Sequence, residues 1–190
     1  MSHLPLPHPR HGAPRRACSR GFTLLELLTV IAIMAVLTSI VIGVGRRASE
    51  SGKIARTKAE LAALATGLEG YKRQYGSYPQ TADAARLLQA LIGKLGPTGV
   101  AMNARAVIET AKFTTANGVD PFVSPLAVLI DPWDQPYVYV YRVPATGWTN
   151  SSFVLYSIGP DGKDSPQLLA GGMIDPTPQE NADNLYANRP

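Results

Sequence analysis

Gly21-Phe22-Thr23-Leu24-Leu25-Glu26 opens an apolar run that extends to Val44. Residues 22–44 number 23, and Glu26 is the only charged residue among them. A helix of about 20 apolar residues spans the roughly 30 Å hydrocarbon core of a bilayer, so this run is long enough to cross a membrane. A carboxylate within such a run is costly unless it has a partner. The sequence therefore predicts a transmembrane helix over residues 22–44 with a functional carboxylate near its start.

The segment before the apolar run, residues 1–21, is a basic leader with four arginines and no acidic residue. Basic segments remain on the cytoplasmic side of a membrane, so we expect a single-pass protein with its C-terminal domain, residues 45–190, on the outer side. The alternative is a secretory signal peptide cut after the apolar run. We favour the membrane helix, because signal peptides have apolar regions of only about 7–15 residues, and no small-residue cleavage pattern lies near Gly45.

The leader also contains the residues on which most catalysis depends. The three histidines and the single cysteine all lie there: His3, His8, His11 and Cys18. From Phe22 onward the chain therefore lacks the side chains for Ser-His-Asp catalysis, Cys-His catalysis and ordinary zinc sites. The formal net charge of +4 also comes from the leader, since 14 basic residues match 14 acidic residues from Phe22 onward. We predict from this balance that the protein does not bind nucleic acid. The missing side chains count against most enzyme chemistries, although a hydrolase with a pair of carboxylates stays open.

An amphipathic helix is predicted to continue the apolar run as far as Tyr75. Its apolar face recurs at spacings of three and four residues, while Lys58, Glu60 and Lys72 lie off that face. The residues of the face are Ile54, Thr57, Leu61, Leu64, Leu68, Tyr71 and Tyr75. A two-stranded coiled coil is the weaker alternative, because the pattern lasts only three heptads. We expect the face to pack on later strands of the same chain.

Those strands follow a loop-rich middle region. Pro79 ends the long helix, and Thr81 is the predicted N-cap of a second, short helix. Residues 104–110 are predicted to form another turn or two of helix. Tyr137–Tyr141 and Phe153–Ile158 are predicted to form a β-hairpin, and the rest of the chain is predicted to be loop. The fold class is α+β, with a long N-terminal helix, transmembrane and then amphipathic, packed on a small antiparallel β-sheet.

The Gly21–Glu26 stretch resembles the processing site of type IV pilin-like proteins, in which Gly-Phe follows a basic leader and Glu is the fifth residue after the cut. Later landmarks resemble the major (G-type) pseudopilin of type II secretion systems. They are Tyr71-Lys72, Tyr78-Pro79, Asp131-Pro132-Trp133, Pro136-Tyr137, Ser157 to Gly162, and Asp183-Asn184. The resemblance covers residues 16–79 and 131–186, and little of residues 80–130.

This resemblance implies a pilin-like fold and a structural role. A prepilin peptidase would cut between Gly21 and Phe22 and methylate the new amino group. The subunits would join copies of themselves and other pseudopilins in a periplasmic filament supporting protein export, built with the help of an inner-membrane assembly platform. Glu26 would pair with the Phe22 ammonium of a neighbouring subunit. Gly43 takes the place of a common family proline, and with Gly45 it marks the predicted melting point of the helix.

The resemblance also implies a structural calcium ion in the C-terminal loop region. Calcium binds six to eight oxygen atoms, and the candidate side chains are those of Asp161, Asp164, Asp183 and Asn184. The alternative is that Asp161-Gly162 is an ordinary turn and that the other polar groups are solvated.

Two other functions remain open from the sequence. The first is a type IV pilin or minor pilin for adhesion, motility or DNA uptake, since the N-terminal pattern does not separate these from a secretion subunit. The second is a membrane-anchored periplasmic enzyme or binding module. The later landmarks favour the secretion pseudopilin.

Overall fold

The computed structural model describes residues 22–143, 146–165, 168–175 and 177–187, with residues 41–46 described by their backbone alone. The chain divides into two compact units, Met1–Gly45 and Arg46–Pro190. The predicted leader, residues 1–21, and its cleavage residue Gly21 lie outside the described residues.

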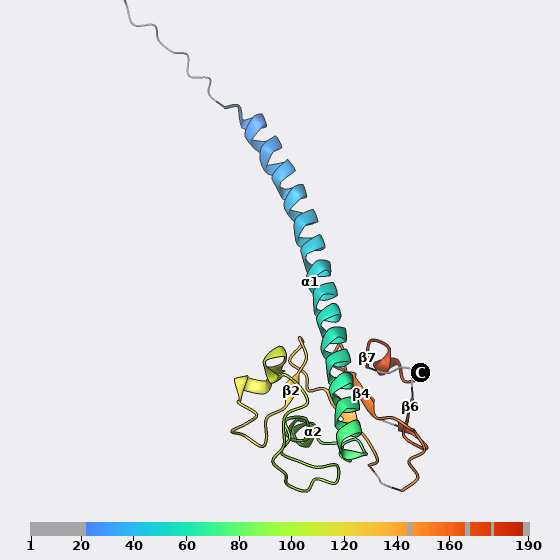
Figure 1. Ribbon diagram of the computed structural model, residues 1–190. Coiled ribbons are helices and arrows are strands. Elements are labelled where there is room, and N and C mark those ends of the chain that lie inside the picture. The colour runs from blue at the N-terminus through green and yellow to red at the C-terminus, as the bar shows by residue number, and fades with distance from the viewer. Residues whose placement is uncertain (1–21, 144–145, 166–167, 176, 188–190) are drawn as a thin grey trace, which may run out of the picture. The chain divides into compact units, whose positions relative to one another are not determined.

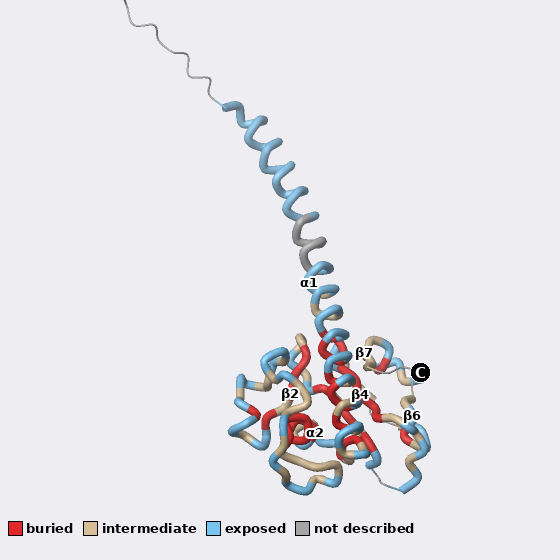
Figure 2. The backbone as a smooth tube through the Cα atoms, viewed as in Figure 1, coloured by how far each residue is buried: buried red, intermediate tan, exposed pale blue. Residues whose placement is uncertain are grey.

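Helix α1 (Leu24–Tyr75) begins in the first unit and ends in the second, so a helix over the predicted range is confirmed. In the first unit every described side chain from Phe22 to Ile40 is exposed, as the pale blue of Figure 2 shows. Among the described residues, no helix combines the length and the apolar character that crossing a membrane requires. The membrane span predicted for residues 22–44 is therefore not confirmed and stays a prediction.

In the second unit, α1 buries the face that the sequence pattern predicts. Thr57, Leu61, Leu64, Leu68 and Tyr71 are each at most 1% exposed. These side chains recur every three or four residues, so they line up along one side of the helix. The central part of the predicted apolar face is thus confirmed.

The prediction was wrong for one residue of this helix, Glu60, which was expected to lie off the apolar face. Its exposed fraction is only 6%. Successive helical residues turn by about 100°, which places Glu60 at the edge of the buried face. Partners from later in the chain cover its carboxylate there.

The main sheet has three antiparallel strands in the order β3-β4-β7. Strand β3 (Val138–Val140) pairs with β4 (Val154–Ser157), which confirms the predicted hairpin. Strand β7 (Leu185–Tyr186) pairs with the other edge of β4, although the sequence predicted only loop there. Two residues are too few to produce a periodic pattern, so sequence periodicity alone does not reveal this strand.

The core of the second unit lies between α1, α2 and this sheet (Figure 1). Helix α2 is Ala84–Leu91. The buried apolar cluster comprises Leu61, Leu64, Leu68, Tyr78, Leu87, Leu88, Leu91, Ile92, Ala127, Leu129, Tyr137, Tyr139, Tyr141, Phe153 and Leu155. The alternating tyrosines around β3 are therefore core residues. The α+β class and the pilin-like arrangement of helix and sheet agree with the prediction.

Two predictions in the middle region need correction. The N-cap of α2 is Asp83, whose Oδ1 accepts hydrogen bonds from the backbone N–H groups of Ala85 and Arg86. Thr81, the predicted cap, instead accepts one from the N–H of Asp83 (3.0 Å). Two polar residues so close together are difficult to rank from sequence, because either can accept from free helix N–H groups.

Residues 104–110 do not form the predicted helix; of these residues only Thr110 is helical, as the first residue of a short 3-10 helix. The N–H of Ala104 donates to the carbonyl of Gly93, and the N–H of Val107 donates to the carbonyl of Leu91. These bonds satisfy carbonyl groups at and beyond the C-terminal end of α2, so tertiary contacts override the local preference for helix.

Short elements complete the second unit. They are the 3-10 helices η1 (Thr110–Lys112), η2 (Ala116–Gly118) and η3 (Gln179–Asn181), and the strands β1 (Thr114–Thr115), β2 (Leu129–Ile130), β5 (Leu168–Leu169) and β6 (Met173–Ile174). Strand β1 pairs with β2, and β5 pairs with β6, both antiparallel.

Candidate functional site

The N-terminal end of α1 is closed by a reciprocal pair of hydrogen bonds between Thr23 and Glu26. The N–H of Glu26 donates to Thr23 Oγ1 (3.2 Å), and the N–H of Thr23 donates to Glu26 Oε2 (3.0 Å). The hydroxyl of Thr23 donates to the same Oε2 (2.9 Å). This is a capping box, in which the side chains satisfy N–H groups that the first turn leaves free. Its signal is the Thr-Leu-Leu-Glu pattern, which our prediction overlooked.

Glu26 therefore has a role within its own chain, and it keeps acceptor capacity for another. Within the described residues, the hydrogen bonds to its carboxylate reach only Oε2. Phe22, directly before the cap, is 80% exposed. The pair between Glu26 and the Phe22 amine of another subunit stays a prediction, because it joins two copies of the chain.

The predicted melting point, Gly43 and Gly45, lies within α1, and the boundary between the two compact units follows Gly45. The backbone is helical through both glycines. Whether the helix melts there during assembly stays a prediction.

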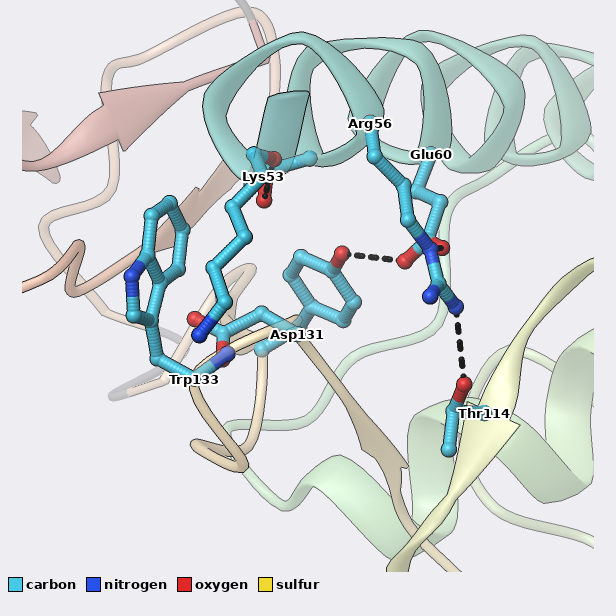
Figure 3. A network of polar contacts seen from close by, with 8 residues as sticks. Lys53, Arg56, Glu60, Thr114, Asp131 and Trp133 are labelled. Carbon is cyan, nitrogen blue, oxygen red and sulfur yellow. Dashed lines mark hydrogen bonds and ion pairs between the residues drawn. The ribbon is translucent and has the colours of Figure 1, made fainter. Parts of the chain in front are cut away.

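A polar network around the buried carboxylate of Glu60 joins α1 to two later segments (Figure 3). Glu60 Oε1 accepts from Arg56 Nε (2.7 Å), and Oε2 accepts from the hydroxyl of Tyr137 (2.6 Å). Arg56 Nη2 also donates to Thr114 Oγ1 in β1 (2.8 Å). Burial, and then the hydrogen bond to Glu60, raise the pKa of Tyr137, so this phenol stays a proton donor. The network compensates for burying Glu60 and fixes the helix against the sheet.

The Asp-Pro-Trp landmark forms a turn held by the buried carboxylate of Asp131. Its Oδ1 accepts from the backbone N–H groups of Trp133 (2.9 Å) and Gln135 (3.0 Å), and Oδ2 accepts from the hydroxyl of Ser157 (2.5 Å). The indole N–H of Trp133 donates to Glu50 on α1 (2.9 Å). Asp131 therefore links the turn to β4, and Trp133 links it to the helix. These landmarks have a structural role in this fold.

In the C-terminal region, the structure brings two of the four predicted calcium ligands together. Asp164 Oδ1 accepts from the side-chain amide of Asn184 (3.1 Å), and Asp164 Oδ2 accepts from the hydroxyl of Tyr156 (2.8 Å). Asn181, which the sequence prediction missed, also accepts from Asn184 (3.3 Å). The Oδ1 atom of Asn184 is buried and has no hydrogen-bond donor among the described residues. Burial raises the pKa of Tyr156, and so does its bond to Asp164.

The other two predicted ligands lie in an adjoining turn. Asp183 Oδ2 accepts from the backbone N–H of Asp161 (3.1 Å), while Asp161 Oδ1 accepts from the N–H of Lys163 (2.8 Å). The side chain of Asp161 thus stabilises a turn, which was the alternative interpretation. A glycine is required at Gly159, where φ is +74° and a Cβ would lie 2.5 Å from the carbonyl oxygen of Asp183. Within the described ranges, no three His, Cys, Asp or Glu side chains are grouped to hold a metal ion.

Comparison with known proteins points to one family. A family model described as type II secretion system protein G matches residues 46–169. A second, described as a prokaryotic N-terminal methylation motif, matches residues 16–42, which include the Gly21–Glu26 stretch.

Three curated relatives carry the same name, type II secretion system core protein G. The protein from Pseudomonas aeruginosa is 31% identical over 150 residues, covering 79% of this chain and 89% of the relative. The protein from Escherichia coli K12 is 28% identical over 146 residues, covering 76% and 83%. The protein from Klebsiella michiganensis is 38% identical over 80 residues, covering 42% and 54%. No solved structure matches the chain.

Proposed function

Because the chain belongs to the family of type II secretion system protein G, we propose that it is a major pseudopilin, a structural subunit and not an enzyme. Copies of the chain polymerise into a filament on the periplasmic side of the inner membrane and so support protein export. The match over residues 46–169 carries this proposal, because it lies in the globular unit. The N-terminal pattern alone does not distinguish a secretion subunit from a type IV pilin. An anchored enzyme with a coincidental N-terminal pattern would lack the match over residues 46–169.

The mechanism of such a subunit is assembly. The exposed apolar side chains of residues 22–40 are covered by lipid while the subunit is in the membrane and by neighbouring helices once it has joined a filament. Glu26 Oε1 then accepts a hydrogen bond from the Phe22 ammonium of the next copy, while Oε2 keeps the capping box closed. Each buried charge thereby gains a partner. The contact is head-to-tail and does not close on itself, so it produces a filament.

The partners follow from this sequence of events. A prepilin peptidase recognises the Gly21-Phe22 junction, and an inner-membrane assembly platform receives the processed chain. Copies of this chain and other pseudopilins then form the filament. Gly43 and Gly45 are positions where α1 can bend or melt as the subunit leaves the membrane, because each glycine weakens a helix by about 1 kcal/mol relative to alanine.

Processing is tested by intact-mass analysis of the chain purified from cells that assemble it. We expect a single species that begins at Phe22 and carries the extra mass of one methyl group on its amino terminus. A Gly21→Val variant serves as the control and should keep residues 1–21, because the larger side chain blocks access to the peptide bond. A chain that begins near Arg46 would instead support the secretory signal peptide.

We also propose that the C-terminal cluster binds a structural calcium ion. The supporting observation is the buried Oδ1 of Asn184, an acceptor without a donor among the described residues. The amide nitrogen of the same side chain contacts the carboxylate of Asp164 and the amide oxygen of Asn181, so further oxygen atoms lie close to it. Buried polar atoms without partners are rare in folded proteins, and a cation would satisfy this one. Oxygen ligands of this kind are those that calcium prefers. Asp183 is the further candidate ligand, and the side chain of Asp161 is the least suited because it serves its own turn.

Calcium removal should lower the melting temperature of the full-length chain in detergent. At a calcium concentration a hundred times the Kd, we expect a melting temperature about 5–10 °C above that in chelator, since ligand binding stabilises the folded state alone. Asn184→Ala should abolish this difference, whereas Asp120→Ala, outside the cluster, should preserve it. A melting temperature that does not respond to chelator would contradict the proposal.

A further inference from the structure

The loop between η2 and β2 presents an unusual apolar surface. We define the 120–126 loop as Asp120-Pro121-Phe122-Val123-Ser124-Pro125-Leu126. Phe122 is 51% exposed, Val123 80% and Leu126 81%. In Figure 1 the segment after η2, coloured yellow, lies at the outer edge of the second unit. Single exposed apolar side chains are ordinary, but three large ones within five residues mark an interaction surface.

The loop is held in one conformation by hydrogen bonds from the body of the unit. Gln89 on α2 is buried, and its side-chain amide donates to the carbonyl groups of Pro121 (3.1 Å) and Ser124 (3.3 Å). Lys94 Nζ donates to the carbonyl of Phe122 (2.5 Å). A buried amide therefore shapes a segment in which Phe122, Val123 and Leu126 are exposed to solvent. Such preorganisation lowers the entropy lost when a surface binds a partner.

The size of the surface limits what its partner can be. A stable interface needs about 800 Å² on each partner, and a side chain as large as Phe provides only about 150–250 Å². Three side chains, one of them half-buried, are too few to hold a free partner alone. The occupant must already be kept nearby by other contacts, which raises its effective concentration.

The charge of the loop also limits which class of partner it can bind. Asp120 is its only charged residue, and the ammonium of Lys94, which lies against the loop, already donates to the carbonyl of Phe122. Surfaces that bind lipid headgroups combine apolar side chains with lysine or arginine, so this loop does not fit a membrane surface. A neighbouring subunit in a filament is already held nearby by the N-terminal helices. Binding it does not require basic residues on the loop. We infer that the 120–126 loop docks on the adjacent copy of this chain in the filament.

This inference rests on the proposed function, and its test distinguishes the two. The photoreactive residue p-benzoylphenylalanine replaces Val123 in the full-length chain, expressed in cells that assemble it. Irradiation should produce a covalent species of twice the mass of the processed chain, in the fraction of filaments sheared from the cells. The product should disappear when Glu26→Ala is added. The same probe at Val100, which is 68% exposed but outside the loop, is the matched control and should give little product.

A second variant tests the contribution of the contact. Val123→Asp combined with Leu126→Asp should reduce the sheared filaments about tenfold, which is the effect of losing one modest apolar contact per subunit. The chain should fold normally, as judged by its resistance to protease, because both side chains are exposed. Filaments that form without the dimeric product, or a probe that captures a different protein, would overturn this inference alone. A wild-type chain that forms no filament would overturn the proposed function together with it.

Discussion

Glu26→Ala should abolish filament assembly while the chain continues to reach the membrane. The apolar residues that direct insertion are unchanged, so membrane fractionation should recover the variant at the level of the original chain. Assembly should fail because the Phe22 ammonium of each subunit would then be buried without a counter-charge. The measurement is the amount of processed chain in sheared filaments. We expect this amount to fall to the detection limit.

Glu26→Gln separates the charge from the capping box. Glutamine retains an oxygen that accepts from Thr23, so it preserves the N-terminal cap, but it does not neutralise an ammonium group. It should therefore fail to assemble, as alanine does. Thr29→Val is the matched control on the same helix, because the Thr29 hydroxyl bonds to the carbonyl of Glu26 within α1. Normal filaments from Glu26→Gln would show that hydrogen bonding at this position suffices without charge.

Sequence periodicity predicted the elements whose pattern extends over many neighbouring residues. The spacing from Thr57 to Tyr71 repeats often enough to define one face of a helix. Five of the seven side chains predicted for that face are buried, and the two at its ends, Ile54 and Tyr75, are partly buried. The hairpin of β3 and β4 followed from two runs of strand-forming residues. Each of these predictions depends on several residues that fit the same helix or strand pattern. One residue that departs from the pattern therefore does not change the prediction.

The contacts that sequence reasoning missed are non-local or very short. Glu60 is buried because Tyr137, 77 positions later, donates to it, and no local pattern reveals that partner. The helix predicted for residues 104–110 does not form, because carbonyl groups at and beyond the end of α2 accept the N–H groups of Ala104 and Val107. Strand β7 has two residues, and Asn181 joins the C-terminal cluster from the short helix η3. The capping box is different, because the motif consists only of Thr23 and Glu26, three residues apart in the sequence. It could have been predicted.

Asp131→Ala should produce a large loss of stability in the globular unit. Asp131 is 2% exposed, and its carboxylate accepts from Ser157, from the N–H of Trp133 and from the N–H of Gln135. Alanine leaves those donors without an acceptor, and each buried unsatisfied group costs about 1–3 kcal/mol. We expect the free energy of unfolding to fall by about 3 kcal/mol or more, equivalent to a melting temperature about 6–12 °C lower. Calorimetry of the full-length chain in detergent measures it.

Two further variants connect this loss to the buried hydrogen bonds. Asp131→Asn keeps one carbonyl oxygen as an acceptor, so it should lose less stability than Asp131→Ala. Asp175→Ala removes a carboxylate that also accepts two bonds, both from Thr177 and both exposed to solvent. It should leave the melting temperature nearly unchanged, because water replaces the lost acceptor. If Asp131→Ala and Asp175→Ala had the same small effect, the turn at Asp131 would not be the connection between β4 and the Asp-Pro-Trp segment that its geometry indicates. The predicted order of melting temperatures, from highest to lowest, is therefore Asp175→Ala, then Asp131→Asn, then Asp131→Ala.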